Sequence, residues 1–186
     1  MTAVVIAAAL LGAISWSFLE YVMHRYWGHD RRFRRTAFGV EHIRHHIEGD
    51  YFAPTWKKLL FAAGVAAGLA LPVVLLGAAV GLPYLAGLLG FYGLYELVHR
   101  RLHTHAGIGW YGRYLRRHHF RHHLVDARSN FGVTSPLWDV VFGTWRRAER
   151  ITVPPRLAMV WLVDRSTGQA RPEHAATYVI GKGKGR

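Results

Sequence analysis

The sequence predicts an all-α integral membrane protein with about three transmembrane helices and a helical, histidine-rich cap on their cytoplasmic side. Two long apolar runs predict the helices, and the placement of the basic residues predicts the orientation. Twelve of the 13 histidines fall in two short windows, 24–46 and 99–123, which predict the cap. At 186 residues the chain is expected to form one domain.

The first apolar run covers residues 1–23 and is long enough for one helix across a hydrocarbon core of ~30 Å. It lacks the positively charged start of a cleaved signal peptide, so we interpret it as a retained anchor. The second run, 59–98, is about twice as long and predicts two crossings. Turn-forming residues at its midpoint, Gly81, Leu82 and Pro83, predict the tip of a hairpin there.

The basic residues predict which side of the membrane each segment occupies. All 24 Lys and Arg lie outside the apolar runs, eight of them in 25–58 and sixteen in 100–186. Lys and Arg accumulate in cytoplasmic segments, so both histidine windows are expected on the cytoplasmic face of a bacterial inner membrane or an endoplasmic-reticulum-type membrane. The net charge of +13 suits a surface that faces anionic headgroups. The sequence has no nucleic-acid-binding motif, and no nucleic-acid partner is expected.

The single domain is therefore expected to be organised in five segments. These are the first transmembrane helix (1–23), the first histidine cluster (24–58), the transmembrane hairpin (59–98), the second histidine cluster and cap (99–150) and a basic tail (151–186). The Gly/Lys end of the tail is expected to be disordered. Because the chain has no cysteine, disulfides, thiolate-ligated haem and cysteine-held iron–sulfur clusters are excluded.

The histidines have regular spacings. Each window ends with a histidine, two other residues and then two adjacent histidines, and on a helix such i, i+3 and i+4 positions converge on one face. His24 and His29 are five residues apart, so one of them is expected beyond the end of the helix. Neutral imidazole is the commonest protein ligand for transition metals, and these histidines outnumber what one ion can use. The predicted ligands of more than one metal ion are His24, His29, His42, His45, His46, His99, His103, His119, His122 and His123.

Three histidines fit no repeated spacing and are expected at the surface or outside the ligand set: His105, His118 and His174. One alternative for all the histidines is an exposed, half-charged basic surface. Another is metal storage or transport, although histidine tracts in that role are usually of low complexity. Here the intervening residues are varied, which favours a shaped site.

Carboxylates inside the apolar runs are candidates for positioning the ligands. A charged residue in a membrane segment is costly and usually functional. Glu20 is four residues before His24, and Glu96 is three before His99, so each carboxylate can accept the second ring N–H of a ligand. The alternative is that both simply reach toward the membrane interface. Asp126 and Asn130 are weaker candidates for the same role.

Taken in order, the four histidine motifs resemble those of the fatty acid hydroxylase / sterol desaturase superfamily of integral-membrane di-iron oxygenases. The stretches 21–25 and 130–144 are also typical of it, and the resemblance covers roughly residues 15–147. The three-residue gap between His99 and His103 resembles the fatty acid and sphingolipid hydroxylase branch. Bacterial β-carotene hydroxylases tend to have a four-residue gap. The chain differs from the best-known hydroxylases in having one membrane helix, not two, before the first motif.

The resemblance implies a hydroxylase with two iron ions that uses O₂ to attack a C–H bond of a membrane-borne acyl chain. Ligand type alone would allow zinc, copper or iron, so iron is implied by the resemblance. Electrons would come from a separate ferredoxin or cytochrome b5-like protein with its reductase. Tyr95, one turn before His99, is the candidate for lining the substrate. A carotenoid (β-carotene) hydroxylase or sterol-type oxidase of the same superfamily is the nearest alternative, and a non-enzymatic membrane metal-binding protein is the alternative of another class.

Overall fold

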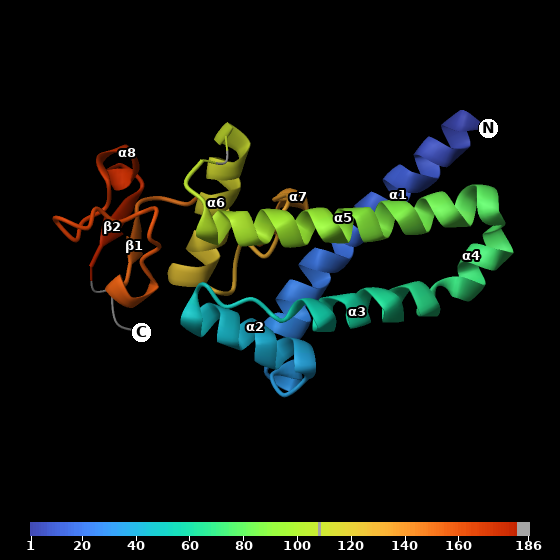
Figure 1. Cartoon of the computed structure of the whole chain (residues 1–186), viewed down its shortest axis with the longest axis horizontal. Coiled ribbons are helices and arrows are strands. Elements are labelled where there is room, and N and C mark those ends of the chain that lie inside the picture. The colour runs from blue at the N-terminus through green and yellow to red at the C-terminus, as the bar shows by residue number, and fades with distance from the viewer. Residues whose placement is uncertain (108, 182–186) are drawn as a thin grey trace. The chain divides into compact units, whose positions relative to one another are not determined.

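The computed structural model describes residues 1–107 and 109–181, and it is mostly helical (Figure 1). The chain forms two compact units. The first consists of Met1–Glu20 and Phe52–Leu97, and the second of Tyr21–Tyr51 and the residues from Val98 onward. Each unit is described below by itself.

The first unit consists of apolar helices: most of α1 (Thr2–Val22), α3 (Thr55–Gly68), α4 (Ala70–Leu76) and most of α5 (Ala78–Thr104). By length and composition, Thr2–Gly28 and Ala78–Thr104 are candidate membrane spans. The pair α3 and α4, bent by 44° at Leu69, qualifies as a third if it is counted as one span. The structure therefore has two or three candidate membrane spans.

The reversal of the chain before α5 lies at Gly77, not at the predicted tip. Gly77 has φ 76°, a conformation that glycine adopts without steric cost, and it separates α4 from α5. Gly81, Leu82 and Pro83 lie inside the first turns of α5 instead. The position of the turn is thus decided by the residue that can take a positive φ, while the early part of a helix accommodates the proline.

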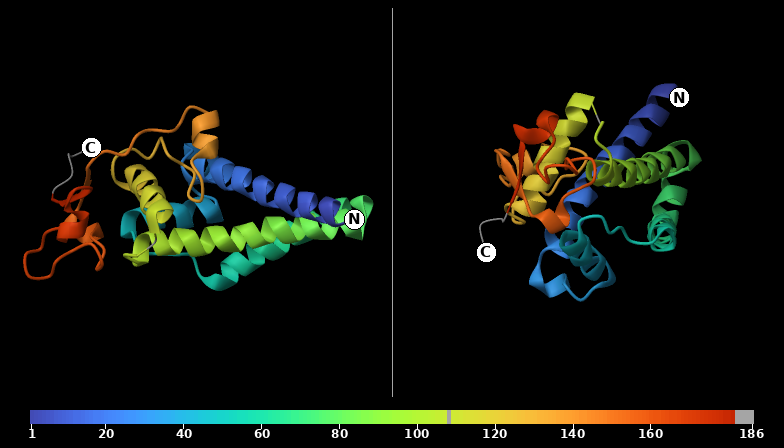
Figure 2. Two further views of the ribbon diagram at one scale, coloured as in Figure 1. Left: turned by 90° about the horizontal axis from the view of Figure 1, so that it is seen from above. Right: turned by 60° about the vertical axis from the view of Figure 1, so that its left-hand side comes forward.

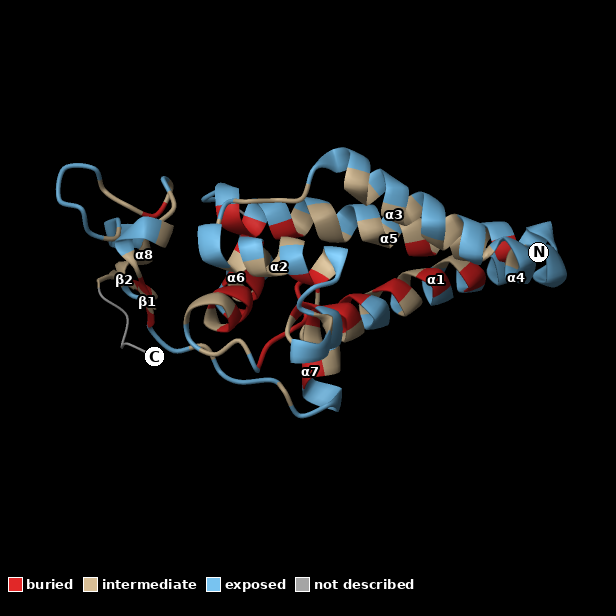
Figure 3. Cartoon of the chain, turned by 90° about the horizontal axis from the view of Figure 1, so that it is seen from below, coloured by how far each residue is buried: buried red, intermediate tan, exposed pale blue. Residues whose placement is uncertain are grey.

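Close backbone contact holds α1 against α5 within the first unit. A Cβ on Gly12 would collide with the carbonyl oxygen of Tyr84, and one on Gly87 would collide with that of Ala9. Further along α1, the buried indole of Trp16 packs on the ring of Tyr92, with 4.6 Å between the centroids. Figure 3 shows that the outer faces of these helices are exposed. Large apolar residues make up much of that exposed surface, as contact with lipid requires: Val4, Ile6, Leu10, Ile14, Leu59, Leu60, Leu71, Val74, Leu75, Leu82 and Leu94.

The second unit begins with a π-helical turn, Met23–Gly28, which follows directly on α1. It also contains α2 (Ala37–Glu48), the end of α5, α6 (Gly109–Leu124) and α7 (Leu137–Val141). The hydroxyl of Thr36 caps the start of α2 by accepting the N–H of Gly39 at 3.1 Å, and Gly49 with φ 77° ends the helix. All ten predicted ligands lie in this unit.

Residues 151–181, expected to be part of a basic tail, are folded. Strand β1 (Ile151–Val153) pairs in parallel with β2 (Tyr178–Ile180), with the short helix α8 (Pro172–Ala175) before β2. Ile151, Val153, Leu162 and Tyr178 bury their side chains against Phe120 of α6. These strands correct the all-α expectation, because runs of three residues are too short to give a periodic signal. The Gly/Lys end, 182–186, lies outside the described residues.

Candidate metal centre

The ten predicted ligands form two groups of five in the second unit, and each group could hold a metal ion. In each group, one nitrogen from every histidine lies within 4.8 Å of the others. The first group consists of His24, His29, His42, His46 and His122. The second group consists of His45, His99, His103, His119 and His123.

The two matching triplets are divided between the groups, whereas the sequence predicted that each would converge on one place. Helix α2 gives His42 and His46 to the first group and His45 to the second. Helix α6 gives its i and i+4 histidines to the second group and His122 to the first. Around the helix axis, i+4 lies about 40° to one side of i and i+3 about 60° to the other side. One helix face therefore serves two neighbouring sites.

The pair His24 and His29 is brought together by the π-helical turn. Hydrogen bonds from i to i+5 widen such a turn, so residues five apart come to the same side. His29 is the residue directly after the turn, and its ring centroid is 5.3 Å from that of His24. The ring of His42 lies over Gly28, where a Cβ would be 2.7 Å from it. Gly28 thus allows α2 to approach the turn.

The spacing of the ring nitrogens fits ligands of a common ion. In the first group, Nε2 of His29 is 2.9 Å from Nε2 of both His42 and His122, and Nε2 of His46 is 3.2 Å from that of His122. In the second group, His45 and His99 approach at 2.9 Å through Nε2. Two imidazole nitrogens bound to one ion at about 2.0–2.1 Å and at right angles would be about 3 Å apart.

Buried ring nitrogens without partners point to the same conclusion. Nε2 of His24 and Nε2 of His123 are buried and have no hydrogen-bonding partner among the described residues. Leaving a buried polar atom unsatisfied costs about 1–3 kcal/mol, so Nε2 atoms aimed into these groups fit a bound cation. A donor set of imidazole nitrogens alone suits zinc, copper or iron and not the oxygen-seeking ions calcium and magnesium.

Desolvation favours the neutral form of five histidines in the two groups. Desolvation is the largest cause, and neighbouring imidazoles add to it, so the pKa of each of the following lies well below its ordinary value: His42, His46, His119, His122 and His123. The neutral ring is the form that binds metal. The protein therefore presents these ligands ready for a cation.

Main-chain carbonyls orient three of the rings. Nδ1 of His24 donates to the carbonyl of Phe131, and Nδ1 of His122 donates to that of Ser129 at 2.8 Å. In the second group, Nδ1 of His45 donates to the carbonyl of Tyr51 at 2.7 Å. A carbonyl can only accept, so each bond places the proton on Nδ1 and leaves Nε2 unprotonated, as a metal ligand must be.

Two of the carboxylates predicted to hold the histidines, Glu96 and Asp126, have other contacts. Glu96 forms an ion pair with Lys58. Asp126 accepts from the main-chain N–H of Arg128 at 3.1 Å. The third predicted carboxylate, Glu20, is buried, with 4% of its surface exposed. The predicted substrate residue Tyr95 lies in the first unit, in an aromatic cluster with Trp16 and Tyr92.

Sequence reasoning missed Asp139 and placed His118 outside the ligand set without a role. Nε2 of His118 is 3.0 Å from Oδ2 of Asp139, and both side chains are almost completely buried. The available signal was an aspartate within the apolar run Trp138–Phe142, since a buried carboxylate needs partners. Of the other two histidines left out, His105 is exposed and His174 packs edge-on against Trp161.

The end of α5, which carries His103, is held by a buried arginine of α6. Arg116 donates through Nε to the carbonyl of Leu102 at 2.8 Å and also to that of His105. Cations stabilise the carbonyl end of a helix. Burial lowers the pKa of Arg116 to about 10, so it remains charged at neutral pH. The guanidinium also lies 4.0 Å over the ring of Trp161.

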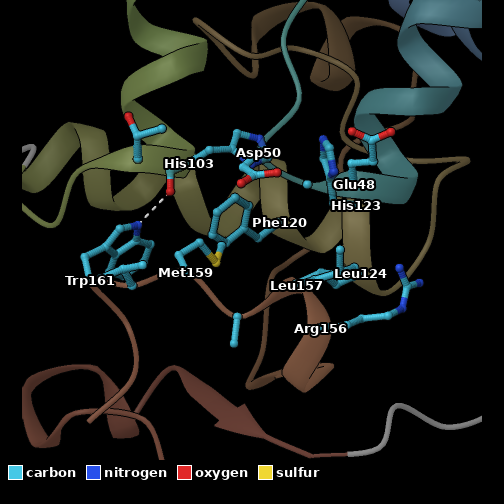
Figure 4. Close-up of a pocket in the computed structure, with 14 residues that line it drawn as sticks. Glu48, Asp50, His103, Phe120, His123, Leu124, Arg156, Leu157, Met159 and Trp161 are labelled. Atoms are coloured by element: carbon cyan, nitrogen blue, oxygen red, sulfur yellow. Dashed lines mark hydrogen bonds between the residues drawn. The ribbon is translucent and has the colours of Figure 1, made fainter. Parts of the chain in front are cut away.

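A cavity of about 270 Å³ adjoins the second group (Figure 4). His103 and His123 contribute to its wall, and Nε1 of Trp161 donates to the carbonyl of His103 at 2.7 Å. Its other lining residues include the apolar Phe120, Leu124, Leu157, Met159 and Trp161 and the charged Glu48, Asp50 and Arg156. The charged residues fit an approach from water.

Comparisons with known proteins agree with this geometry. A family model described as fatty acid hydroxylase matches residues 9–144. The chain is 33% identical over 148 residues to a fatty acid 2-hydroxylase of Macaca fascicularis, covering 73% of this chain and 38% of that protein. It is 28% identical over 155 residues to a dihydroceramide fatty acyl 2-hydroxylase of Arabidopsis thaliana, covering 75% of this chain and 61% of that protein.

Among solved structures, full-length scs7p, with only its hydroxylase domain visible, is similar with a TM-score of 0.59 and 28% identity. The match covers 78% of this chain and 59% of that one. The chain thus spans less than two thirds of the length of each of these three proteins.

Proposed function

The chain belongs to the fatty acid hydroxylase family, and from that premise we propose that it is an O₂-dependent hydroxylase of a membrane-borne acyl chain. The two relatives described above are a fatty acid 2-hydroxylase and a dihydroceramide fatty acyl 2-hydroxylase, which supports a lipid substrate hydroxylated near its carbonyl end. The observation that carries the proposal is the pair of five-histidine groups, with their nitrogens at the spacing of common ligands.

The two groups are proposed to hold two iron ions, one in each. When bound, iron supplies the redox chemistry with O₂ that an unactivated C–H bond requires. One oxygen atom enters the C–H bond and the other leaves as water, which consumes two electrons and two protons. A separate ferredoxin or cytochrome b5-like protein with its reductase is proposed as the electron donor.

The residues of this chain provide the setting for that reaction. The buried imidazoles bind the ions as neutral ligands, and the carbonyls of Phe131, Ser129 and Tyr51 fix three of the rings. Six of the ten histidines are buried, which limits the access of water and so protects a reactive centre from side reactions. The cavity with Glu48 and Asp50 in its wall is proposed as the aqueous approach to the second group, suited to delivering protons.

The substrate is proposed to approach from the membrane. His24, His99 and His103 lie in the last two turns of the two candidate spans. A lipid with its headgroup at the interface presents its first few carbons at that depth. Tyr95 remains the proposed substrate-lining residue, and Glu20, Glu96 and Asp126 remain proposed positioning carboxylates. The centre is proposed to lie on the cytoplasmic side, which the basic residues of 25–58 and 100–186 support.

The experiment is expression in a host that makes β-carotene but no hydroxylated fatty acids, followed by mass spectrometry of its hydrolysed lipids and its pigments. We expect 2-hydroxy fatty acids, and none with a chain in which His45 and His122 are both replaced by Ala. Zeaxanthin in their place would assign the chain to carotenoid hydroxylation. A chain that binds two metal ions but yields no oxidised product with a working donor would be a metal-binding protein and not an enzyme.

A further inference from the structure

One peptide group connects His24 to a carboxylate that sequence analysis did not single out. The carbonyl of the peptide between Phe131 and Gly132 accepts the Nδ1 proton of His24. The N–H of the same peptide, on Gly132, donates to Oδ2 of Asp139 at 2.8 Å. Hydrogen bonds in series polarise one another. An anion on the N–H side therefore makes this carbonyl a better acceptor for His24.

All the acceptor positions of Asp139 are used. Oδ1 accepts from the N–H of Phe131 at 2.8 Å and from the hydroxyl of Thr144 at 2.7 Å, while Oδ2 accepts from Gly132 and His118. A carboxylate has about four such positions, and this one is 0% exposed. Burial acts to raise the pKa of Asp139, but the hydrogen bonds from His118, Thr144 and Gly132 outweigh it and hold the pKa below its ordinary value. The group is an anion at neutral pH.

The same network reaches His122. Nδ1 of His122 donates to the carbonyl of Ser129, and the N–H of that peptide, on Asn130, donates to the carbonyl of Thr144 at 3.1 Å. Thr144 also donates its hydroxyl proton to Asp139, so the hydroxyl of Tyr21 must be the donor in their contact at 3.0 Å. The segment 129–132 is therefore anchored at two peptide groups, 129–130 and 131–132, each of which holds one histidine of the first group.

Gly132 allows its peptide group to lie close to the carboxylate of Asp139. A Cβ there would collide with the carbonyl oxygen of Ser135 and would lie 3.1 Å from Oδ2 of Asp139. Any other residue would push the peptide away from the carboxylate. Asn130, buried and with φ 59°, takes the left-handed conformation that asparagine tolerates, and its side chain bonds to the main chain of Arg146.

We propose that Asp139 is a positioning residue for the first histidine group, acting through the Gly132 peptide on His24 and through Thr144 on His122. The proposal rests on the proposed two-metal centre. The hydrogen-bonded paths from Asp139 to His24 and to His122 together form a relay. Because both histidines belong to the first group, the proposal gives Asp139 a role at that site alone.

A competing role runs through the other partner of Asp139. His118 lies on α6 next to His119, which belongs to the second group. If Asp139 acted through His118, its loss would weaken the second site. Loss of Asp139 should therefore weaken the first site if it acts through His24 and His122, and the second site if it acts through His118. Measuring the metal affinity of each site separately distinguishes the two routes.

The test uses the full chain in detergent, stripped of metal and titrated with Co²⁺ by its visible absorption. Two backgrounds isolate the sites: His45→Ala leaves only the first group intact, and His46→Ala leaves only the second. Asp139→Asn is placed in each. Wherever the amide NH₂ points, it faces the N–H of Phe131 or of Gly132, so one main-chain donor of the segment loses its acceptor. We expect Co²⁺ affinity to fall about 10–100-fold in the His45→Ala background and to stay unchanged in the His46→Ala background.

The matched control is Asp164→Asn, which replaces a half-buried aspartate of 151–181 whose side chain binds Ser166 and Thr167 nearby. It should leave both affinities unchanged. Equal affinity of Asp139→Asn and its parent at the first site, or weakening at the second site alone, would overturn the relay. Should Asp139→Asn fail to fold, Thr144→Val removes one donor to Oδ1 and keeps the carboxylate. It should weaken the first site selectively, and equal weakening of both sites would refute the proposal.

Failure of the relay and failure of the metal centre give different results. A wild-type chain that does not bind two Co²⁺ ions contradicts the proposed centre itself. A wild-type chain that binds two, with an Asp139→Asn variant that binds them equally well, contradicts only the role of Asp139.

Discussion

His45 and His122 show an exchange between the two halves of the chain, because each belongs to the histidine group that the other half otherwise forms. His45 is the only member of the second group from the first half of the chain, and His122 is the only member of the first group from the second half. Both are the i+3 residue of the same spacing, and each ring is fixed through Nδ1 by a main-chain carbonyl. Each site is therefore completed by the other half, so neither histidine window can form its site alone.

The exchange predicts how single replacements affect metal content. The wild-type chain should hold two metal ions, as measured by mass spectrometry of the purified protein. His45→Ala should weaken the second site and His122→Ala the first, so each should retain close to one ion. His174→Ala, which touches neither group, is the control and should retain two. Loss of both ions from either variant would mean that the two groups form one inseparable site.

Glu96 is predicted to support metal binding beyond its ion pair with Lys58. Loss of a carboxylate that orients a histidine ligand typically costs about 10–100-fold in metal affinity. Glu96→Gln should therefore weaken metal retention in a competition with a chelator, while Lys58→Met should leave it unchanged. Equal retention by the two variants would assign Glu96 to the ion pair alone.

The membrane topology is predicted from the basic residues and from Gly77. Reporters inserted after Gly49 and fused after Gly181 should both report the cytoplasm, because the surrounding segments contain all the Lys and Arg. A reporter at Gly77, where the chain reverses, should report the opposite side. A cytoplasmic signal there would mean that the bent pair α3 and α4 is a re-entrant loop.

Trp161 is predicted to stabilise the contact between residues 151–181 and the end of α5. Trp161→Phe keeps a ring over Arg116 but removes the donor to the carbonyl of His103. It should lower the free energy of unfolding by about 1 kcal/mol, and Trp161→Ala should cost more because packing is lost too. Thermal melting measures both. Trp110→Phe, at a residue 76% exposed, should change stability by less than about 0.5 kcal/mol.

Asp139 is predicted to contribute to stability in a pH-dependent way. Its pKa is below the ordinary value because His118 of α6, Thr144 after α7 and the N–H groups of 131 and 132 all donate to it. A depressed folded-state pKa stabilises the protein above the unfolded pKa of about 3.9 and loses that contribution as pH falls through the folded value. The stability difference between wild type and Asp139→Asn should thus be constant near pH 7 and shrink below about pH 4. A difference that grows in acid would contradict the sign.

The sequence by itself determined the local features. Unbroken apolar runs predicted the candidate spans, because a helix in lipid must be apolar along its whole length. The repeated spacing of the histidines predicted that they would act together, because i, i+3 and i+4 positions share a helix face whatever surrounds it. Both inferences depend only on neighbours along the chain. The sequence did not predict the short strands β1 and β2 or the turn at Gly77, because their signals are confined to one to three residues.

Only the tertiary structure decided which histidine serves which site. Spacing places His42, His45 and His46 on one face, but the division among them depends on where α5, α6 and the π-helical turn meet that face. The peptide that holds His24 is 107 residues away in sequence, and Asp139 lies beyond that peptide. Periodicity within a segment carries no information about partners at that distance, because packing between segments brings them together.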